Sequence, residues 1–223
     1  MMFAKLNASD YEYNSVFYNA EFEYILSKII TCYHLLKSDN VYLTNDENTI
    51  RDVLLINYLK NNQIRNKINL TEFLFDREVP EDNTLGRTDI KIQTLNTFQD
   101  TSAYYIIECK RIDATNPNGT AGLNAKYIKS GINRFTSTSY SSHYKTNGMI
   151  GFVVAPIDIK QNVSLINILL VTSFCESKTT QDLQYRNIVP DFEFSYCSYH
   201  NVAGNSVILY HLMFDLSMNI RVT

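Results

Sequence analysis

The strongest structural signal in this chain is the segment Tyr104-Tyr105-Ile106-Ile107-Glu108-Cys109-Lys110-Arg111. Its first four residues are apolar, so the segment has no polar face, which is typical of a central β-strand covered on both sides. Polar residues begin only at Glu108. We therefore expect a buried strand in the middle of a sheet, with Glu108 at the point where this strand meets solvent.

Two further strands are predicted on the N-terminal side of this segment. Residues Arg87 to Leu95 alternate with a period of two, so that Ile90 and Ile92 face opposite to Asp89, Lys91 and Gln93. Residues Phe73 to Val79 precede them, and Pro80 with the polar turn Glu81-Asp82-Asn83 stops that run. The pattern indicates neighbouring strands that bring Asp89 and Glu108 into one sheet.

Helical spacing of apolar residues predicts three helices. The first covers Phe22 to Leu36. The second opens at Thr44, because Thr44 to Glu47 has the pattern of a capping box, and it ends at Asn61-Asn62. The third covers Leu123 to Phe135, after a loop rich in turn-forming residues.

The C-terminal third gives weaker signals. Met149 to Ala155 is an apolar strand, and the order strand, helix, strand favours a crossover between two parallel strands. Val163 to Phe174 is compatible with a helix or a buried strand, because a short apolar run does not distinguish them. Phe192 to Tyr199 and Ser206 to Leu216 are typical of a β-hairpin, which we expect at one edge of the sheet.

Length and composition favour one domain over all 223 residues. Hydrophobic residues make up 45% and charged residues 19%, and no Pro/Gly/Ser-rich tract suggests a linker. We expect N-terminal helices in 19–62, a core in 70–156, and a C-terminal extension in 157–223. The first residues do not resemble a leader peptide, and no apolar stretch is long enough for a membrane span, so a cytoplasmic protein without membrane contact is expected.

Cysteines and net charge exclude other classes of protein. The four cysteines form no CxxC pair or His/Cys cluster, which argues against structural zinc and favours reduced thiols. The net charge of −3 argues against a protein that coats nucleic acid non-specifically. Between Glu108 and Arg134, however, five basic residues stand against two acidic ones, which allows a basic patch beside an acidic site.

The chemistry-bearing residues are Asp89, Glu108 and Lys110. Two carboxylates at the end of a sheet are hard oxygen ligands for a divalent cation. Glu108 and Lys110 lie two positions apart on a strand, so their Cα atoms are about 6.6 Å apart and their side chains share a face. Cys109 points to the other face, and its side chain needs no role in the chemistry. This set is sufficient for metal-assisted hydrolysis of a phosphodiester.

These residues resemble the PD-(D/E)XK nuclease superfamily, which includes many restriction and repair endonucleases. The resemblance covers about Thr44 to Ala155, with Glu47 on a helix, Asp89 at a strand end, Glu108-x-Lys110 on the next strand, and then a helix with basic and aromatic residues. It implies an α/β fold with a restriction endonuclease-like core, in which helices flank a central mixed β-sheet. It also implies Mg²⁺ or Mn²⁺ held by Asp89, Glu108 and the backbone carbonyl of Cys109, with Lys110 orienting or activating the attacking water.

Other residues are candidates around this centre. Glu47 is either an additional metal or water ligand or only a helix cap. Contacts with a nucleic-acid backbone are expected from Arg87, Arg111, Lys126, Tyr127, Lys129 and Arg134, although Tyr127 and Arg134 are also compatible with covering the sheet or pairing with acidic residues. A histidine-based site is disfavoured, because His143, His200 and His211 have no Cys or Asp at a metal-ligand spacing.

The resulting expectation is a Mg²⁺-dependent endonuclease that acts on DNA. Family analogy adds a role in defence against phage or other foreign DNA. No helix-turn-helix or zinc-finger pattern is visible, so we expect a homodimer or a partner protein to supply recognition or helicase activity. Two alternatives are an RNA nuclease, because phosphate and metal are the same in both polymers, and a catalytically inactive module that binds nucleic acid or protein.

Overall fold

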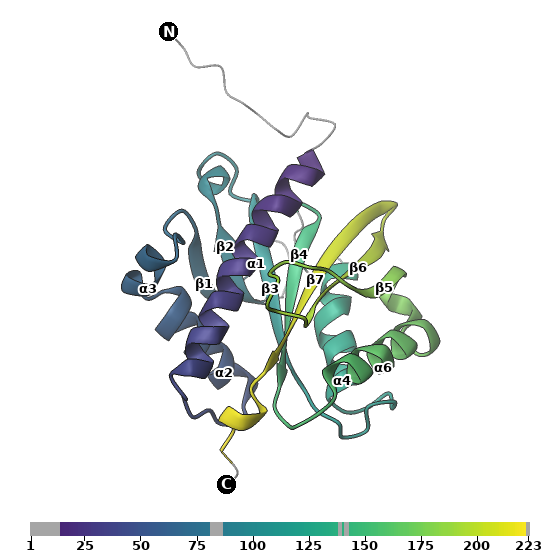
Figure 1. Cartoon of the computed structure of the whole chain (residues 1–223). Helices are drawn as coiled ribbons and strands as arrows, with labels where there is room; N and C mark the ends of the chain where they lie inside the picture. Colours follow the sequence, from purple (N-terminus) through teal and green to yellow (C-terminus); the bar gives the residue numbers. More distant parts are fainter. Residues whose placement is uncertain (1–13, 81–86, 138–139, 141–142, 222–223) are drawn as a thin grey trace.

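Seven strands form one mixed β-sheet, and helices cover both of its faces (Figure 1). The computed structural model describes residues 14–80, 87–137, 140 and 143–221. The strand order across the sheet is β1-β2-β3-β4-β7-β6-β5. The strands are β1 (Leu74–Pro80), β2 (Arg87–Gln93), β3 (Tyr104–Ile112), β4 (Thr146–Val153), β5 (Thr179–Tyr185), β6 (Ser195–Val202) and β7 (Asn205–Asp215).

Three parallel strands form the middle of the sheet. β3 pairs with β4 in parallel, and β4 pairs with β7 in parallel, whereas the other neighbouring strands are antiparallel. All eight residues of β4 are buried, as are eight of the nine in β3. The expected crossover between two parallel strands is therefore confirmed, and so is the position of the Tyr104 segment at the centre of the sheet.

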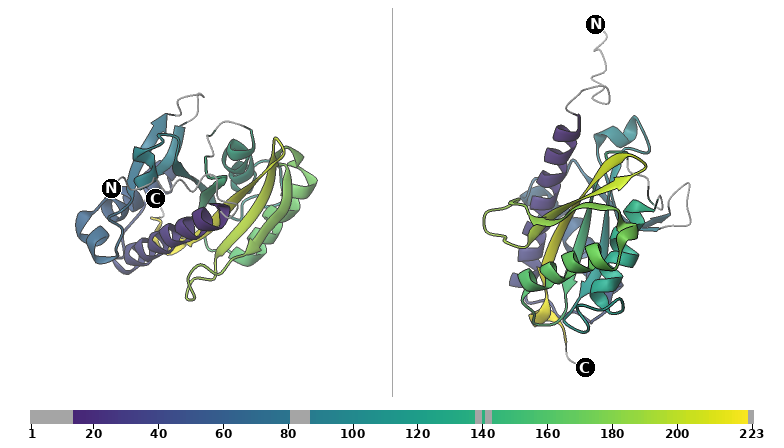
Figure 2. Two further views of the ribbon diagram at one scale, coloured as in Figure 1. Left: turned by 90° about the horizontal axis from the view of Figure 1, so that it is seen from above. Right: turned by 90° about the vertical axis from the view of Figure 1, so that its right-hand side faces the viewer.

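The helices form two layers. α1 (Asn14–Ser38) lies across one face of the sheet, and α4 (Leu123–Tyr127) and α6 (Ile159–Thr172) lie on the other, as the two views in Figure 2 show. The remaining helical segments are α2 (Glu47–Leu54), α3 (Asn62–Lys67), α5 (Asn133–Thr136), the π-helical turns η2 (Leu55–Leu59) and η4 (Ile128–Ile132), and the 3-10 turns η3 (Leu95–Phe98), η5 (Cys175–Ser177) and η6 (Ser217–Asn219).

Side chains of β3 alternate between the two layers. Tyr105 and Cys109 pack in the hydrophobic cluster under α1, whereas Ile106 packs in the cluster under α4 and α6. Because side chains alternate along a strand, Glu108 and Lys110 face the same side as Ile106. β3 also continues to Ile112 instead of ending near Glu108, so the expectation that Glu108 meets solvent is wrong: its exposed fraction is 0%.

The helix expected at Thr44 begins three residues later. α2 starts at Glu47, and its N-cap is Asp46, whose Oδ1 accepts a 2.9 Å hydrogen bond from the backbone N–H of Thr49. The predicted capping box from Thr44 to Glu47 is therefore wrong, because Asp46 already provides the cap. This frees the Glu47 carboxylate for other contacts. α2 continues into the π-helical turn η2, which ends at Leu59, close to the expected end.

The predicted helix over Leu123 to Phe135 is present as α4, η4 and α5 in succession. Gly131 lies in the π-helical turn η4 and is buried against β3 and β4. A Cβ atom at this position would clash with Cε of Met149 and lie 3.4 Å from Cγ of Lys110. Gly131 thus allows the helix to pack directly against the aliphatic stem of Lys110.

The C-terminal part agrees with expectation in its elements but not in their place in the sheet. The ambiguous run that begins at Val163 belongs to helix α6. β6 and β7 form the expected hairpin, and its two-residue turn has positive φ at both Ala203 (50°) and Gly204 (82°), which favours glycine and matches the twist of a hairpin. However, β7 lies inside the sheet beside β4, and the edge strand is β5, which the sequence did not indicate.

Other expectations concern cysteines, membranes and one turn. The four cysteines are free, three of them buried and Cys175 exposed. Within the described ranges, no helix is long and apolar enough to cross a membrane. The predicted turn Glu81-Asp82-Asn83 lies outside the described residues.

Candidate functional site

The candidate site lies where β2 and β3 separate. Their paired residues end with Ile90↔Ile107. Beyond this pair, the backbone N–H of Cys109 donates a 2.8 Å hydrogen bond to Oδ2 of Asp89, and the N–H of Arg111 donates a 3.1 Å hydrogen bond to Oε2 of Glu47. Two carboxylates thus satisfy backbone donors on β3, and this fixes both of them beside the strand.

The ammonium group of Lys110 lies among oxygen atoms from four residues. Its Nζ is 2.8 Å from Oε1 of Glu108, 2.7 Å from the carbonyl oxygen of Cys109, and 3.0 Å from Oε1 of Glu47. Oδ2 of Asp89 is 3.7 Å away. Glu47, Asp89, Glu108 and Lys110, all proposed from the sequence, therefore converge on one point.

The protonation state of Lys110 follows from these neighbours. Burial lowers the pKa of Lys110, but attraction to Glu108, Asp89 and Glu47 outweighs burial, so the net shift of its pKa is upward. Lys110 is therefore a cation at neutral pH. It can donate hydrogen bonds and offset negative charge.

Glu108 is a fully buried carboxyl group held by three partners. Besides Lys110, Nη1 of Arg134 lies 2.9 Å from its Oε1, and the hydroxyl of Tyr140 donates a 2.6 Å hydrogen bond to its Oε2. Burial and repulsion from Asp89 raise the pKa of Glu108 to about 7, although Lys110 and Arg134 act in the opposite direction. The group can therefore exchange a proton near neutral pH.

Arg51 is part of the cluster, although it was not expected from the sequence. Its side chain is 2% exposed, and its Nη1 lies 3.2 Å from Oδ1 of Asp89. Its Nη2 lies 2.8 Å from Oε1 of Glu78 and 2.8 Å from Oδ1 of Asp52. One sequence signal was available: Arg51 follows Glu47 by four positions, so both side chains share one face of α2.

Glu78 and Tyr140 were also missed. The β1–β2 register pairs Arg77 with Ile90 and Val79 with Thr88, which places Glu78 opposite Asp89. Tyr140 lies in the connection after α5, and its hydroxyl contacts Arg134 (2.6 Å) as well as Glu108. No spacing or periodicity in the sequence distinguishes Tyr140 from the other tyrosines.

The residues expected to contact nucleic acid fall into two groups. Arg87, Lys126 and Lys129 are exposed, and Arg111 and Arg134 are half-buried. Tyr127 differs: it is fully buried, and its hydroxyl lies 2.8 Å from Nδ1 of His211. The expectation for Tyr127 is therefore corrected, because a side chain inside the core does not reach a backbone phosphate.

The histidines do not form a competing site. His211 and His200 are buried and connected through the hydroxyl of Ser198, at 2.7 and 2.8 Å from their Nε2 atoms. Nδ1 of His200 contacts the carbonyl oxygen of Ser177 at 2.8 Å. This chain of hydrogen bonds satisfies the buried polar groups, which is a structural role.

The oxygen atoms around Lys110 are of the kind that hard divalent ions prefer. Asp89, Glu108 and the Cys109 carbonyl already surround one cationic nitrogen, so this donor set fits Mg²⁺ or Mn²⁺ in chemical type. The described residues contain no group of three or more His, Cys, Asp or Glu side chains arranged to hold a metal ion.

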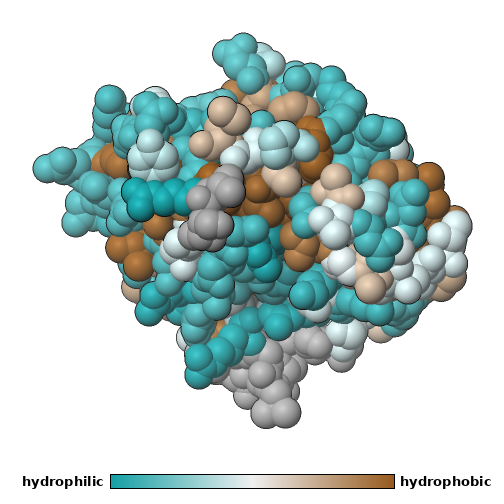
Figure 3. Space-filling view, turned by 90° about the horizontal axis from the view of Figure 1, so that it is seen from below, coloured by the Kyte–Doolittle hydropathy of each residue, from teal (hydrophilic) through white to brown (hydrophobic). Residues whose placement is uncertain are grey.

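The face of the molecule toward which β3 and β4 run is mostly polar (Figure 3). β3 and β4 run toward the end of the molecule where β7 leads into η6, at the bottom of Figure 1. Viewed from below, the visible surface is mostly hydrophilic, with hydrophobic residues in separate patches (Figure 3).

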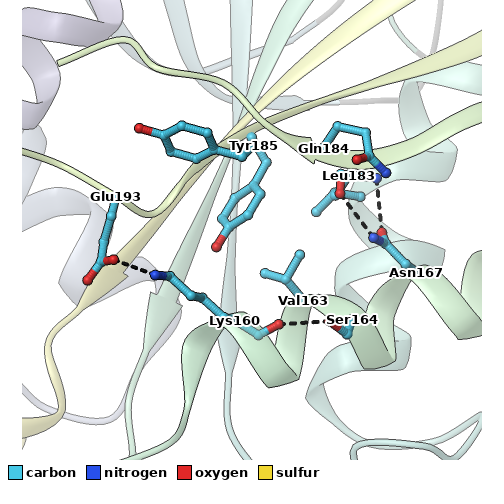
Figure 4. A pocket seen from close by; sticks show the side chains of 9 residues that line it. Lys160, Val163, Ser164, Asn167, Leu183, Gln184, Tyr185 and Glu193 are labelled. Carbon is cyan, nitrogen blue, oxygen red and sulfur yellow. Dashed lines mark hydrogen bonds and ion pairs between the residues drawn. The ribbon is translucent and has the colours of Figure 1, made fainter. Parts of the chain in front are cut away.

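A cavity of about 610 Å³ lies elsewhere, between α6 and the strands β5 and β6 (Figure 4). Lys160 and Glu193 form an ion pair at this cavity. The side-chain amide of Asn167 is bonded to both backbone polar groups of Leu183, at 3.0 and 2.9 Å. These polar groups are paired within the protein, and none of the lining residues belongs to the Lys110 cluster.

Comparison with protein-family models, with curated proteins and with solved structures gives no match for this chain. Function is therefore inferred from the geometry of the site.

Proposed function

We propose that this chain is a metal-dependent endonuclease that hydrolyses phosphodiester bonds of DNA on a restriction endonuclease-like core. One observation carries the proposal. The Lys110 ammonium group is surrounded by oxygen atoms of Glu47, Glu108 and the Cys109 carbonyl, with Asp89 at 3.7 Å. Three chain segments far apart in sequence thus supply a cation-binding set of oxygens beside a buried lysine.

Asp89, Glu108 and the carbonyl of Cys109 would hold Mg²⁺ or Mn²⁺. A bound divalent ion would lower the pKa of a coordinated water and offset negative charge on the phosphate. Glu47 would supply its Oε1 atom as an additional ligand for the metal ion or its water. This atom contacts Lys110, and the cap of α2 is Asp46. The contacts of Glu47 favour a role in the site over a role as a helix cap.

The remaining steps belong to residues of the chain itself. Lys110, as a cation, would hydrogen bond to the attacking water and stabilise charge on the phosphate. Arg134 and Tyr140 fix the carboxylate of Glu108. Exposed Arg87, Lys126 and Lys129, with half-buried Arg111, would bind backbone phosphates, which is a sequence-independent contribution to affinity.

Biological context is proposed by family analogy alone. We propose a role in defence against foreign DNA, with a second copy of the chain or a partner protein supplying recognition or helicase activity. The modest net charge supports this division of labour, because the chain alone has little electrostatic affinity for DNA.

A second candidate is a catalytically inactive binding module. It is favoured by one observation: Asp89 and Glu108 are already paired with cationic side chains, through Arg51, Lys110 and Arg134. A site of this kind is stable as a closed ion-pair network without any metal.

One assay separates these candidates. Purified protein is incubated with plasmid DNA or with single-stranded RNA, each with Mg²⁺, Mn²⁺ or a chelator. Metal-dependent cutting of DNA supports the proposal, and cutting of RNA alone makes the chain a ribonuclease. Binding without cutting of either polymer, with any partner protein present, supports the inactive module.

A further inference from the structure

Arg51 holds the second oxygen of Asp89. Oδ2 of Asp89 accepts the hydrogen bond from Cys109 and faces Lys110, whereas Oδ1 lies 3.2 Å from Nη1 of Arg51. The guanidinium group is anchored in turn by Asp52 and Glu78. Both oxygens of Asp89 are therefore engaged, one on the side of Lys110 and one on the side of Arg51.

The backbone determines where these groups meet. Arg51 lies on the same face of α2 as Glu47, and Glu78 lies opposite Asp89 on β1. Glu78 has a positive φ of 48°, which is unfavourable for a residue with a Cβ atom. The same residue contacts Arg51 through its carboxylate. Glu78 and Asp89 are thus neighbours across β1 and β2, and Asp89 lies beside β3 through its hydrogen bond with Cys109.

Arg51 occupies a position that matters for the number of metal ions. Two-metal phosphodiesterase sites hold their ions about 3.5–4 Å apart and need carboxylate oxygens on both sides. On the Arg51 side of Asp89, Oδ1 of Asp89 and Oε1 of Glu78 are carboxylate oxygens that a second ion would need, and both contact the guanidinium group. An arginine remains charged at every relevant pH, so this positive charge is permanent.

We propose that Arg51 is a positioning residue that fixes Asp89 and supplies a permanent positive charge in place of a second divalent ion, so that the site binds one ion. This inference rests on the proposed function. It goes beyond that function because it sets the number of divalent ions bound per chain and assigns a role to Arg51, which is not a metal ligand.

The test is the number of Mn²⁺ ions bound per chain, measured by calorimetry and by electron paramagnetic resonance of free Mn²⁺. The wild type is expected to bind one ion. Arg51→Lys keeps the positive charge and is expected to bind one, whereas Arg51→Gln removes the charge and is expected to bind two. Arg77→Gln is the matched control, because Arg77 contacts Asp52 (2.9 Å) in the same cluster and is half exposed; its expected count is one.

Cleavage gives a second readout. At saturating Mg²⁺, Arg51→Gln is expected to cut DNA at least tenfold more slowly than wild type, with partial recovery in Arg51→Lys. A wild-type count of two, or a folded Arg51→Gln variant with one ion of unchanged affinity, would overturn the inference alone. A wild-type count of zero would overturn the proposed function and the inference with it.

Glu78→Gln covers the case in which Arg51→Gln does not fold. Glu78 is 38% exposed, so its replacement leaves the core intact while removing one anchor of Arg51. The expected result is one bound ion and cleavage at least threefold slower than wild type. An unchanged cleavage rate would overturn the positioning role.

Discussion

The hydroxyl of Tyr140 donates a 2.6 Å hydrogen bond to Oε2 of the fully buried Glu108. This contact joins the connection after α5 to the central strand of the sheet, and it leaves Oε1 of Glu108 to Lys110 and Arg134. Tyr140 thus holds Oε2 of the carboxylate, while Oε1 faces Lys110.

Removal of this hydroxyl is expected to cost stability and activity together. Tyr140→Phe leaves one oxygen of a buried carboxylate without its donor, which lowers the free energy of unfolding by about 1–3 kcal/mol. Urea unfolding measures that loss, and DNA cleavage is expected to fall about tenfold. Tyr144→Phe is the control, because Tyr144 is also buried but its hydroxyl contacts Thr94 and Asn96 only at 3.5 and 3.3 Å. Full activity in Tyr140→Phe would contradict the assigned role.

Glu47 and Asp46 are adjacent residues with different expected roles. Asp46→Ala removes the N-cap of α2 and should lower stability by about 1 kcal/mol with little change in cleavage. Glu47→Ala removes a contact with Lys110 and should slow cleavage at least tenfold, measured under single-turnover conditions. The reverse pattern, with normal cleavage in Glu47→Ala, would show that Glu47 has no part in the reaction.

Exposed lysines and buried Tyr127 should respond differently in DNA binding. Replacement of Lys126 and Lys129 by alanine should weaken binding to all sequences and reduce the slope of log K against log salt by about 2. Tyr127→Phe should lower stability, because it removes the hydrogen-bond partner of Nδ1 in His211. It should leave DNA binding unchanged. Fluorescence anisotropy across a salt series measures DNA binding by both variants, and urea unfolding measures the stability of Tyr127→Phe. An unchanged slope in the double lysine variant would exclude phosphate contacts by these residues.

Much of the fold could be predicted from the sequence, because its signals are local. The apolar run from Tyr104 identifies the central strand, and the alternation around Ile90 places Asp89 on the face it occupies. Edge strand β5 escaped prediction because only Leu183 among its residues is buried, so no apolar pattern marks it. The hairpin was recognised, but its position inside the sheet depends on pairing between β7 and β4, which are far apart in sequence.

The candidate site was predictable in its acids and its lysine but not in their environment. The spacing from Glu47 places Arg51 on the same face of α2, but no local spacing encodes its contact with Asp89 or the contact of Tyr140 with Glu108. Burial of Glu108 was missed for a related reason. A carboxylate in a sequence usually indicates a solvent-exposed position. In this chain, contacts with Lys110, Arg134 and Tyr140 compensate the cost of burying Glu108.

The buried histidines predict a loss of stability in acid. Burial lowers the pKa of His200 to about 4 and that of His211 well below its ordinary value. The unfolded chain takes up protons near pH 6.5 while the native state does not. The contribution of the two histidines to the free energy of unfolding is therefore complete above pH 6.5 and is lost as the pH falls toward 4. For His200 the loss amounts to about 3 kcal/mol.

The contribution of His200 to stability is measured as a difference between wild type and a His200 variant. This is necessary because the raised pKa of Glu108 makes stability increase as the pH falls from about 7 to the ordinary pKa of a glutamate. Urea unfolding of wild type and His200→Gln is compared from pH 7 to pH 4. The stability difference between the two proteins should shrink as the pH falls. A difference that is constant over this range would show that His200 does not remain neutral in the native state.

The most direct test of the central claim compares wild type with Glu108→Gln in cleavage of the same plasmid DNA. Glutamine keeps the size of the side chain and removes its charge, and unfolding curves establish that both proteins are folded. We predict that the wild type cuts DNA with Mg²⁺ and not with a chelator, and that Glu108→Gln is at least a hundredfold slower. Equal cutting by both proteins, or no metal-dependent cutting of DNA or RNA by the wild type, would contradict the account.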